Sequence, residues 1–462
     1  MSDEIRQTAG EPAKGATMKE YNARQVFLMS LPIFAELLLQ LLVGNVDQIM
    51  ISRYSQAGVA AIGNGNQIIN IIVIFISSMS AAATIMLSQY IGAKDEKRAG
   101  DVCHVAFLVV GGASLAASLA LFLFWRPLFS WLRISADVVP DARNYLLTVG
   151  AFIVVQGCYM TFTAILRSYA YLREILIMAL VMNGLNIAGN AVLINGLFGM
   201  PRLGVLGAAI STDLSKCVGL AIAARIYARR VGIPLRLSRL RPFPGAVCRR
   251  MLFFALPTGG ESLSYDLSQA FILRFVNLFG TAVVATKVYC SILANVAYVY
   301  SIAISQATQI VVGYLVGEQR SDRIGRRVWM AVGIALAVSL SITALLWCNS
   351  DRVFGLFTRD RSVWALGRTI LAIEFFLEIG RSVNIVMVRA LVATGDVRLP
   401  VGAGIVSCWA VAVAGAWLLG VHFGMGLPGI WIAMAIDEAL RGAVFSVRFL
   451  TGGWRKHLPA AL

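Results

Sequence analysis

Apolar stretches of about 20 residues, each long enough to cross a lipid bilayer as a helix, recur along this 462-residue chain. One soluble core could not bury so many of them, so they predict a polytopic membrane protein. Composition agrees, because 58% of the residues are hydrophobic and only 14% are charged. We expect an all-α integral membrane protein with twelve transmembrane helices, near residues 25–52, 60–90, 103–125, 144–166, 174–195, 204–227, 251–279, 285–315, 328–348, 363–392, 399–421 and 428–449.

The two halves of the chain are related by a constant shift of 225 residues. The residues that this shift pairs include Pro32 with Pro257, Glu36 with Glu261, Gly92 with Gly317, and Arg98 with Arg323. A constant offset across a six-span unit indicates a duplication. Because six is an even number, the two repeats enter the membrane in the same direction, as in transporters that rock two bundles about a central site.

The repeat predicts a domain organisation with two bundles joined by an arginine-rich linker. The expected parts are an N-terminal segment 1–24, a six-helix bundle 25–228, a linker 229–250, a second six-helix bundle 251–450 and a tail 451–462.

The net charge of +16 would suggest a nucleic-acid partner in a soluble protein. Here most cations lie in the short connections between apolar spans, so we expect no nucleic acid and read them as topology signals. With the N-terminus inside, the inner loops hold more than twice as many Lys and Arg residues as the outer loops. Arg167 is counted among these inner-loop residues. The first 24 residues contain no apolar signal-peptide core. Both termini are therefore predicted to be cytoplasmic, in a bacterial inner membrane.

The first apolar span carries two carboxylates, Glu36 and Asp47. Eleven residues correspond to about 20° beyond three full helical turns, so both share one face, together with Gln40. Each carboxylate costs about 2.5–3.5 kcal/mol at the centre of a membrane helix, and such groups face a wet or protein-lined interior. Neighbouring helices could satisfy both as packing. Two carboxylates on one face of one span favour a functional role.

The repeat separates the other ionisable residues into two classes. Asp213 with Lys216 in the first half matches Glu438 with Arg441 in the second, an opposite-charge pair with i,i+3 spacing. Symmetric pairs of this kind are most simply structural.

Three charges of the tenth span, Glu374, Glu378 and Arg381, have uncharged counterparts in the first repeat. They share one helix face, and Arg381 is within i,i+3 reach of Glu378. An arginine can hold one carboxylate ionised while the other titrates. A self-satisfied structural cluster is an equally open interpretation.

The fifth span carries Asn183, Asn186 and Asn190 at helical spacing. Amide and carboxylate oxygens suit a proton relay or a small hard cation, and hydrogen bonding between helices is an equally good alternative. The chain contains no GxxxxGK[ST], HExxH or GxSxG motif, its three histidines are scattered, and its seven cysteines form no CxxC pair. We therefore expect a protein that is not an enzyme and holds no cofactor beyond a coupling ion.

Several ordered segments are similar to the multidrug and toxin compound extrusion (MATE) family. They are PIFAELLLQLLVGNVDQIMIS, SQYIGAKDEKR, AILRSY, LPTGGE, ExxRxxN at 378–384 and GMGLPGIWIA, and the similarity runs from about residue 25 to 455. The resemblance implies twelve helices in two six-helix bundles that form a V. It also implies export of organic cations in exchange for sodium ions or protons.

The resemblance also implies roles for individual residues. Asp47 matches the first-helix aspartate associated with ion coupling, and Pro32 resembles the proline at which that helix bends. Asn186 matches the fifth-helix asparagine of the N-terminal site. Asn190 departs from the aspartate that proton-coupled archaeal members carry there. Glu261 lies where other branches use an acidic residue of helix seven, and Glu378 where they use one of helix ten.

The sequence thus predicts a monomeric antiporter in the lipid bilayer that exports cationic small molecules. The expected ion-coupling residues, which could also hold sodium, are Asp47, Asn186 and Asn190; the expected hinge is Pro32; and the expected substrate-cavity residues are Glu36, Gln40, Glu261, Glu378 and Arg381. Two alternatives stay open. A flippase for lipid-linked intermediates would have a more cationic cavity, and the DRIGRR segment at 322–327 resembles part of a major facilitator signature.

Overall fold

The structure, a computed structural model, describes residues 22–235 and 243–459. Within these ranges it is all-helical and contains no strand, as the sequence predicts. The α-helices are α2 (Ala23–Tyr54), α3 (Gln56–Gly92), α4 (Glu96–Trp131), α5 (Val139–Ala151), α6 (Ile153–Ser168), α7 (Leu172–Asn195), α8 (Gly204–Arg230), α9 (Gly245–Val276), α10 (Thr281–Gly317), α11 (Ser321–Cys348), α12 (Ser350–Gly355), α13 (Arg361–Thr394), α14 (Arg398–Ser407) and α15 (Gly426–Leu450).

Two of the twelve expected spans are interrupted. The fourth consists of α5 and α6, which are bent by 45° at Phe152. The eleventh begins as α14 and continues as two π-helical segments, Cys408–Val413 and Ala416–His422. Counting each interrupted span once, and the short α12 as a connection, the described residues contain the twelve expected spans.

Eight single helices in the described part are long and apolar enough to cross a membrane, or nine spans when α5 and α6 are taken together. The remaining long helices, α9, α13 and α15, are less apolar. These three helices carry carboxylates well inside their length, including Glu261, Glu378 and Glu438. Their lower hydropathy is therefore the cost of placing ionisable groups inside the bundle.

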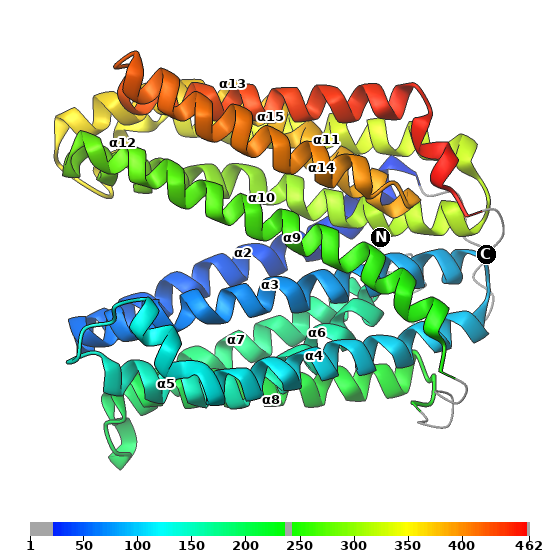
Figure 1. Cartoon of the computed structure of the whole chain (residues 1–462), viewed down its shortest axis with the longest axis horizontal. Helices are drawn as coiled ribbons and strands as arrows, with labels where there is room; N and C mark the ends of the chain where they lie inside the picture. Colours follow the sequence, from blue (N-terminus) through cyan, green and yellow to red (C-terminus); the bar gives the residue numbers. More distant parts are fainter. Residues whose placement is uncertain (1–21, 236–242, 460–462) are drawn as a thin grey trace, which may run out of the picture.

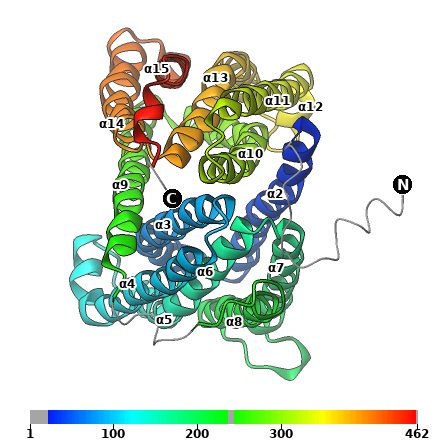
Figure 2. The ribbon, with the colours of Figure 1, turned by 90° about the vertical axis from the view of Figure 1, so that its right-hand side faces the viewer.

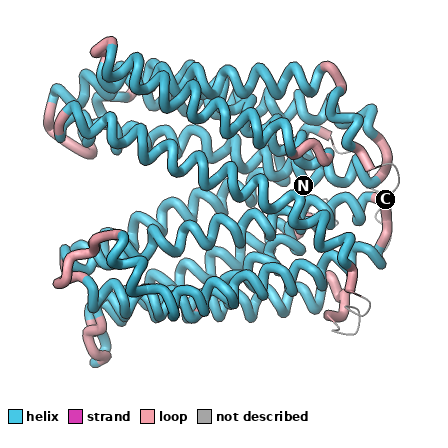
Figure 3. The backbone as a smooth tube through the Cα atoms, in the orientation of Figure 1, coloured by secondary structure: helices cyan, strands magenta, loops and turns pink. Residues whose placement is uncertain are grey.

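The helices form two groups that follow the repeat, α2–α8 and α9–α15 (Figure 1). The groups come together at the end where α2 begins and α15 ends, which we call the terminal end, and diverge toward the opposite end. Viewed end-on, α2 and α9, the first helices of the two repeats, lie on opposite flanks of the junction (Figure 2). The loops lie at the two ends of the molecule (Figure 3).

The backbone repeats as well as the sequence. Lys94 and Gln319, which the shift of 225 pairs, both adopt a left-handed conformation with φ of 58° just after a helix ends. Ala170 and Gly395, another such pair, do the same with φ of 59° and 98°. Non-glycine residues rarely adopt this conformation, so its recurrence at equivalent positions supports a duplicated six-helix unit.

Gly92 and Gly317 mark the place where the two groups touch most closely. A Cβ atom on Gly92 would collide with the backbone of Tyr314, and one on Gly317 would collide with the backbone oxygen of Gln89. Helices α3 and α10 thus cross in backbone contact at the terminal end. Only glycine permits such an approach.

Polar contacts surround this crossing. Gln89 Nε2 donates to the carbonyl of Ala393 at 2.8 Å, and Arg250 Nη2 donates to Gln89 Oε1 at 2.6 Å. The hydroxyl of Tyr314 donates to the carbonyl of Ser168. Helices from both repeats are therefore joined by hydrogen bonds as well as by packing.

Candidate functional site

Glu36 of α2 is 5% exposed, and its carboxylate is held by Arg167 of α6. Arg167 Nη2 lies 2.9 Å from Oε2 and 3.1 Å from Oε1 of Glu36, while Nη1 donates to Oε1 of Gln306 in α10 at 2.7 Å. Gln40 Nε2 adds a contact of 3.4 Å to Glu36. One arginine therefore links α2 and α6 of the first repeat to α10 of the second.

The prediction that Arg167 lies in an inner loop is wrong. The residue belongs to the last turn of α6, and its long side chain reaches a buried carboxylate instead of water. Its repeat counterpart is Val392, so this pair has no equivalent in the second half. The arginine inside the apolar AILRSY segment was the signal that could have revealed the pair.

Replacing Arg167 by Met is expected to lower the free energy of unfolding by about 1.5–3 kcal/mol, because Glu36 would stay buried without its charged donor. The measurement is unfolding of the purified protein in a denaturant titration. Arg173→Met, at an exposed position near the start of α7, is the matched control and should change stability by less than about 0.5 kcal/mol. An equal effect of both substitutions would contradict the proposed pairing.

Glu261, the repeat counterpart of Glu36, lies in α9 against α14. A Cβ atom on Gly404 would stand 2.6 Å from Glu261 Oε1, so the glycine makes room for the carboxylate. The charges of Arg441 in α15 and of Arg389 in α13 act on Glu261. Both repeats therefore place an arginine near this glutamate, but Arg389 is one turn away from the position that corresponds to Arg167.

The three charges of α13 form one cluster, as their spacing predicts. Arg381 Nη1 lies 2.6 Å from Oε1 of Glu374 and 2.6 Å from Oε1 of Glu378, and both carboxylates are buried. Trp431 of α15 donates through Nε1 to Glu374 Oε2 at 2.6 Å. The guanidinium of Arg381 stacks over the ring of Tyr298 in α10.

The two carboxylates of the α13 cluster differ in one respect. Both oxygens of Glu374 accept hydrogen bonds, whereas Oε2 of Glu378 has no hydrogen-bond partner in the part of the chain that the structure describes. Buried polar atoms are nearly always paired in folded proteins. Oε2 of Glu378 is therefore an acceptor available to a proton or a cation.

A second cluster lies on α15. Arg441 Nη2 pairs with Asp437 and, at 3.1 Å, with Oε1 of Glu438. Asn384 Nδ2 donates to Oε2 of Glu438 at 2.7 Å, and the hydroxyl of Ser407 donates to Oδ1 of Asp437 at 2.5 Å. The predicted Glu438–Arg441 pair is confirmed, and with these extra donors all four carboxylate oxygens of Asp437 and Glu438 accept hydrogen bonds.

The matching pair of the first repeat behaves differently. Asp213 in α8 is 2% exposed, and neither of its carboxylate oxygens has a hydrogen-bond partner within the described residues. The i,i+3 spacing predicts a close ion pair with Lys216, yet the described residues show none within 4.0 Å. The predicted pair therefore makes no direct contact, although the charge of Lys216 acts on Asp213.

Asn186 and Asn190 of α7 are buried and lie next to each other. Asn190 Nδ2 donates to Oδ1 of Asn186 at 3.4 Å, and Asn186 Nδ2 donates to Oγ1 of Thr212 in α8 at 3.2 Å. The backbone of Asp47 belongs to α2, but its side chain lies outside what the structure describes. Its predicted approach to Asn186 and Asn190 stays a prediction.

Oxygen ligands of this type suit a hard cation such as sodium. Among the described residues, no group of three or more His, Cys, Asp and Glu side chains is placed to hold a metal ion.

Helix α2 continues through Pro32 without a break. Proline has no N–H, so the carbonyl of Leu28 loses its helical donor, as the predicted hinge requires.

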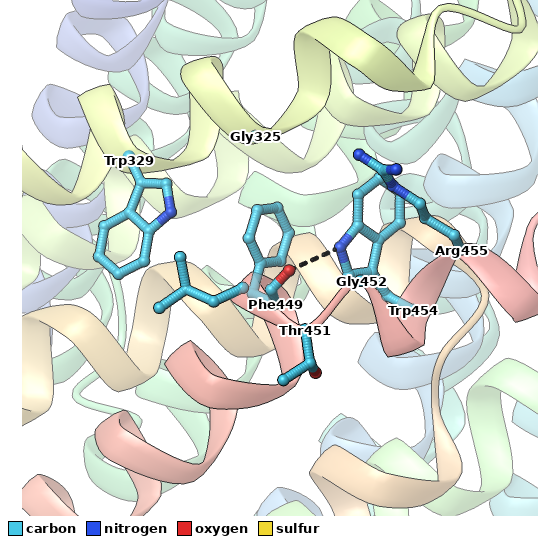
Figure 4. A pocket seen from close by; sticks show the side chains of 8 residues that line it. Gly325, Trp329, Phe449, Thr451, Gly452, Trp454 and Arg455 are labelled. Atoms are coloured by element: carbon cyan, nitrogen blue, oxygen red, sulfur yellow. Dashed lines mark hydrogen bonds between the residues drawn. The ribbon is translucent and has the colours of Figure 1, made fainter.

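A hollow at the terminal end lies apart from these residues (Figure 4). Its walls come from α11 and from the end of α15, and Trp454 Nε1 donates to the carbonyl of Phe449 at 3.0 Å. Tryptophan and arginine side chains, here Trp329, Trp454 and Arg455, are typical of a membrane–water interface. The hollow contains none of the predicted site residues.

Sequence reasoning missed the partners that come from other helices. Trp431, Asn384 and Gln306 are single polar groups in apolar spans, and nothing in their local pattern indicates which carboxylate or arginine they contact. The shift of 225 pairs Asn384 with Tyr159 in the sequence, and this difference between the repeats could have drawn attention to Asn384.

Known proteins share both the sequence and the fold of this chain. The MatE family matches it twice, at residues 32–192 and 257–418, so the two matches begin 225 residues apart. A relative named "Uncharacterized transporter YisQ", from Bacillus subtilis, is 35% identical over 93% of this chain and 94% of the relative. A Thermotoga maritima relative named "Probable multidrug resistance protein NorM" is 24% identical over 94% of this chain and 93% of its own.

The fold is shared with solved transporters. The Vibrio cholerae MATE transporter VcmN in the bent form superposes with a TM-score of 0.87 at 22% identity, covering 94% of this chain and 97% of that one. The match decides against the major facilitator alternative. With both repeats matched and more than nine-tenths of its length shared with a 35% identical relative, this chain belongs to the MatE family of multidrug and toxin compound extrusion transporters.

Proposed function

We propose that this protein is a secondary active antiporter that exports organic, cationic small molecules in exchange for protons or sodium ions. One observation carries the proposal: a MatE-family bundle holds carboxylates inside its membrane spans, and at Glu378 one carboxylate oxygen is left for a ligand. The NorM relative, named as a probable multidrug resistance protein, agrees with such a substrate class. The protein acts as a monomer, without enzymatic chemistry or a nucleic-acid partner.

Exchange requires that substrate and coupling ion compete for one state of the protein. A carboxylate can mediate this competition, because its charge attracts a cationic substrate and is cancelled by a proton. Glu378 fits this role, since Arg381 holds one of its oxygens and leaves the other open. In the first repeat, Asp47 is the candidate for the same role, although it is not paired with Glu378 by the shift of 225. Asn186 and Asn190 would supply oxygen ligands if the ion is sodium. Bending of α2 at Pro32 would couple the charge of Asp47 to the substrate site.

The balance of buried charge favours a cationic substrate over the anionic substrate of a lipid-intermediate flippase. Carboxylates outnumber arginines among the clustered groups of the two repeats. The carboxylates are Glu36, Glu261, Glu374, Glu378, Asp437 and Glu438, and the arginines are Arg167, Arg381, Arg389 and Arg441.

The excess of Lys and Arg in the loops of the terminal end supports a cytoplasmic location for that end. The protein would then sit in a bacterial inner membrane with both chain termini inside the cell.

The decisive experiment is dye efflux from proteoliposomes driven by a pH step and, in separate vesicles, by a sodium step. We expect one of the two gradients to drive efflux by the wild-type protein, and Asp47→Asn to lose at least about 90% of it, because the charge that binds the coupling ion is gone. Gradient-driven efflux by Asp47→Asn at the wild-type rate would contradict the role of Asp47. A wild-type protein that responds to neither gradient would contradict the antiporter itself.

A further inference from the structure

We propose that Asp213 in α8 is a proton-binding site of the first repeat, separate from Asp47, and that it takes part in the exchange. The inference rests on the proposed antiport function for its role in transport. Asp213 lies nine residues into a 27-residue helix, which places it about 13 Å from the start of α8 and well inside the span.

The carboxylate of Asp213 is buried without a hydrogen-bond donor among the described residues. Asp213 is 2% exposed, and Oδ1 and Oδ2 both lack a hydrogen-bond partner within residues 22–235 and 243–459. An ionised carboxylate that is buried without donors costs several kcal/mol. A bound proton removes this cost because it cancels the charge. An ionisable group of this kind inside a membrane span is also a candidate for function rather than for stability.

The equivalent acid of the second repeat has hydrogen-bond donors. Glu438, the counterpart of Asp213, receives a hydrogen bond from Asn384, and its neighbour Asp437 receives one from Ser407. The residues at those two positions in the first repeat are Tyr159 and Met182. Of these two donors, Asn384 bonds to Glu438 itself, so the first repeat has kept the acid and carries Tyr159 in place of its amide donor. Among the described residues, the two repeats therefore differ in whether the acid at this position accepts hydrogen bonds.

Lys216 is the charged group that acts on Asp213 among the described residues. On α8 itself, the charges of Lys216 and Asp213 act on each other, and the charge of Asp213 also acts on Cys217. The described residues of α2, α3, α5, α6 and α7, which pack against α8, bring no further charge that acts on it. Tyr159 of α6 faces α8 about two turns closer to the terminal end, at Gly219.

Lys216 and burial act in opposite directions on the balance between the protonated and the ionised form of Asp213. Its cationic charge one turn away partly stabilises the ionised carboxylate, whereas burial opposes ionisation. A proton also fits this place better than a sodium ion does. A hard cation needs several oxygen ligands, and Met182 stands where the second repeat has a serine hydroxyl.

The test that needs no transport is infrared difference spectroscopy of the purified full-length protein during a pH titration. A protonated carboxylic acid has a carbonyl stretch that an ionised carboxylate lacks. We expect a band of this kind that titrates in the wild type, is lost in Asp213→Asn and persists, shifted in frequency, in Asp213→Glu. Asp360→Asn, at an exposed carboxylate just before α13, is the matched control and should leave the band unchanged.

The second measurement links the site to exchange. Tetraphenylphosphonium is added to weakly buffered protein, and released protons are counted with a pH indicator. We expect Asp213→Asn to release about one proton fewer per molecule than the wild type. An unchanged infrared band together with unchanged proton release in Asp213→Asn would overturn the proposal. Loss of the band on addition of sodium at constant pH would overturn it as well, in favour of a sodium site.

The two proposals can fail separately. A wild-type protein that transports but whose Asp213→Asn variant keeps the band and the proton release leaves the antiporter standing and removes Asp213 from it. A wild-type protein without gradient-driven transport contradicts the antiporter, and the infrared band still decides whether Asp213 binds a proton.

Discussion

Replacement of Arg381 by Met is expected to lower the free energy of unfolding by about 3–5 kcal/mol. The guanidinium is the shared partner of Glu374 and Glu378, which are 1% and 0% exposed. Without it, two carboxylates would stay buried side by side without a cation, and removing one partner of a buried network costs far more than the net value of the pair. The measurement is a denaturant titration of the purified protein, with transport assayed in parallel.

Two controls separate loss of the ion pair from loss of an arginine on α13. Arg368→Met, at an exposed position of the same helix, should change stability by less than about 0.5 kcal/mol. The triple variant Glu374→Gln, Glu378→Gln, Arg381→Met removes all three charges and should recover most of the lost stability. A triple variant as unstable as Arg381→Met alone would show that packing by the arginine, rather than its charge, supports the cluster.

Replacement of Gly317 by Val is expected to cost about 1–3 kcal/mol or more and to abolish transport. A side chain at this position would overlap the backbone of α3 at Gln89, and a backbone atom cannot move aside as a flexible side chain can. The two groups of helices would therefore have to separate at the terminal end, where they now touch. Thermal unfolding and dye efflux measure the two effects.

Gly92→Val tests the same crossing from the other helix and should have a similar effect, because its side chain would overlap the backbone of Tyr314. Gly333→Val, at an exposed glycine of α11 with no atom near its added Cβ, is the control and should stay active. Normal efflux by Gly317→Val would contradict the view that this crossing must stay closely packed for function.

Much of the architecture follows from features that are local in the sequence. Apolar length predicts where α3 or α10 crosses the membrane, because a span must satisfy its own backbone hydrogen bonds in lipid. The contact of Arg381 with Glu378 is equally local, since residues three apart share one helix face. The break at Phe152 and the π-helical turns of the eleventh span were not predictable in this way. They depend on how the segment packs against its neighbours.

By itself, the sequence determined the helix count, the duplication and the set of ionisable residues inside the spans. Only the tertiary structure decided which groups from other helices satisfy those residues: Arg167, 131 positions away, pairs with Glu36, and Trp431 on α15 donates a hydrogen bond to Glu374. It also left both carboxylate oxygens of Asp213 without a hydrogen-bond donor among the described residues. The physical reason is that periodicity defines the face of each helix, whereas a charge deep in a bundle is satisfied by whichever helix packs against that face.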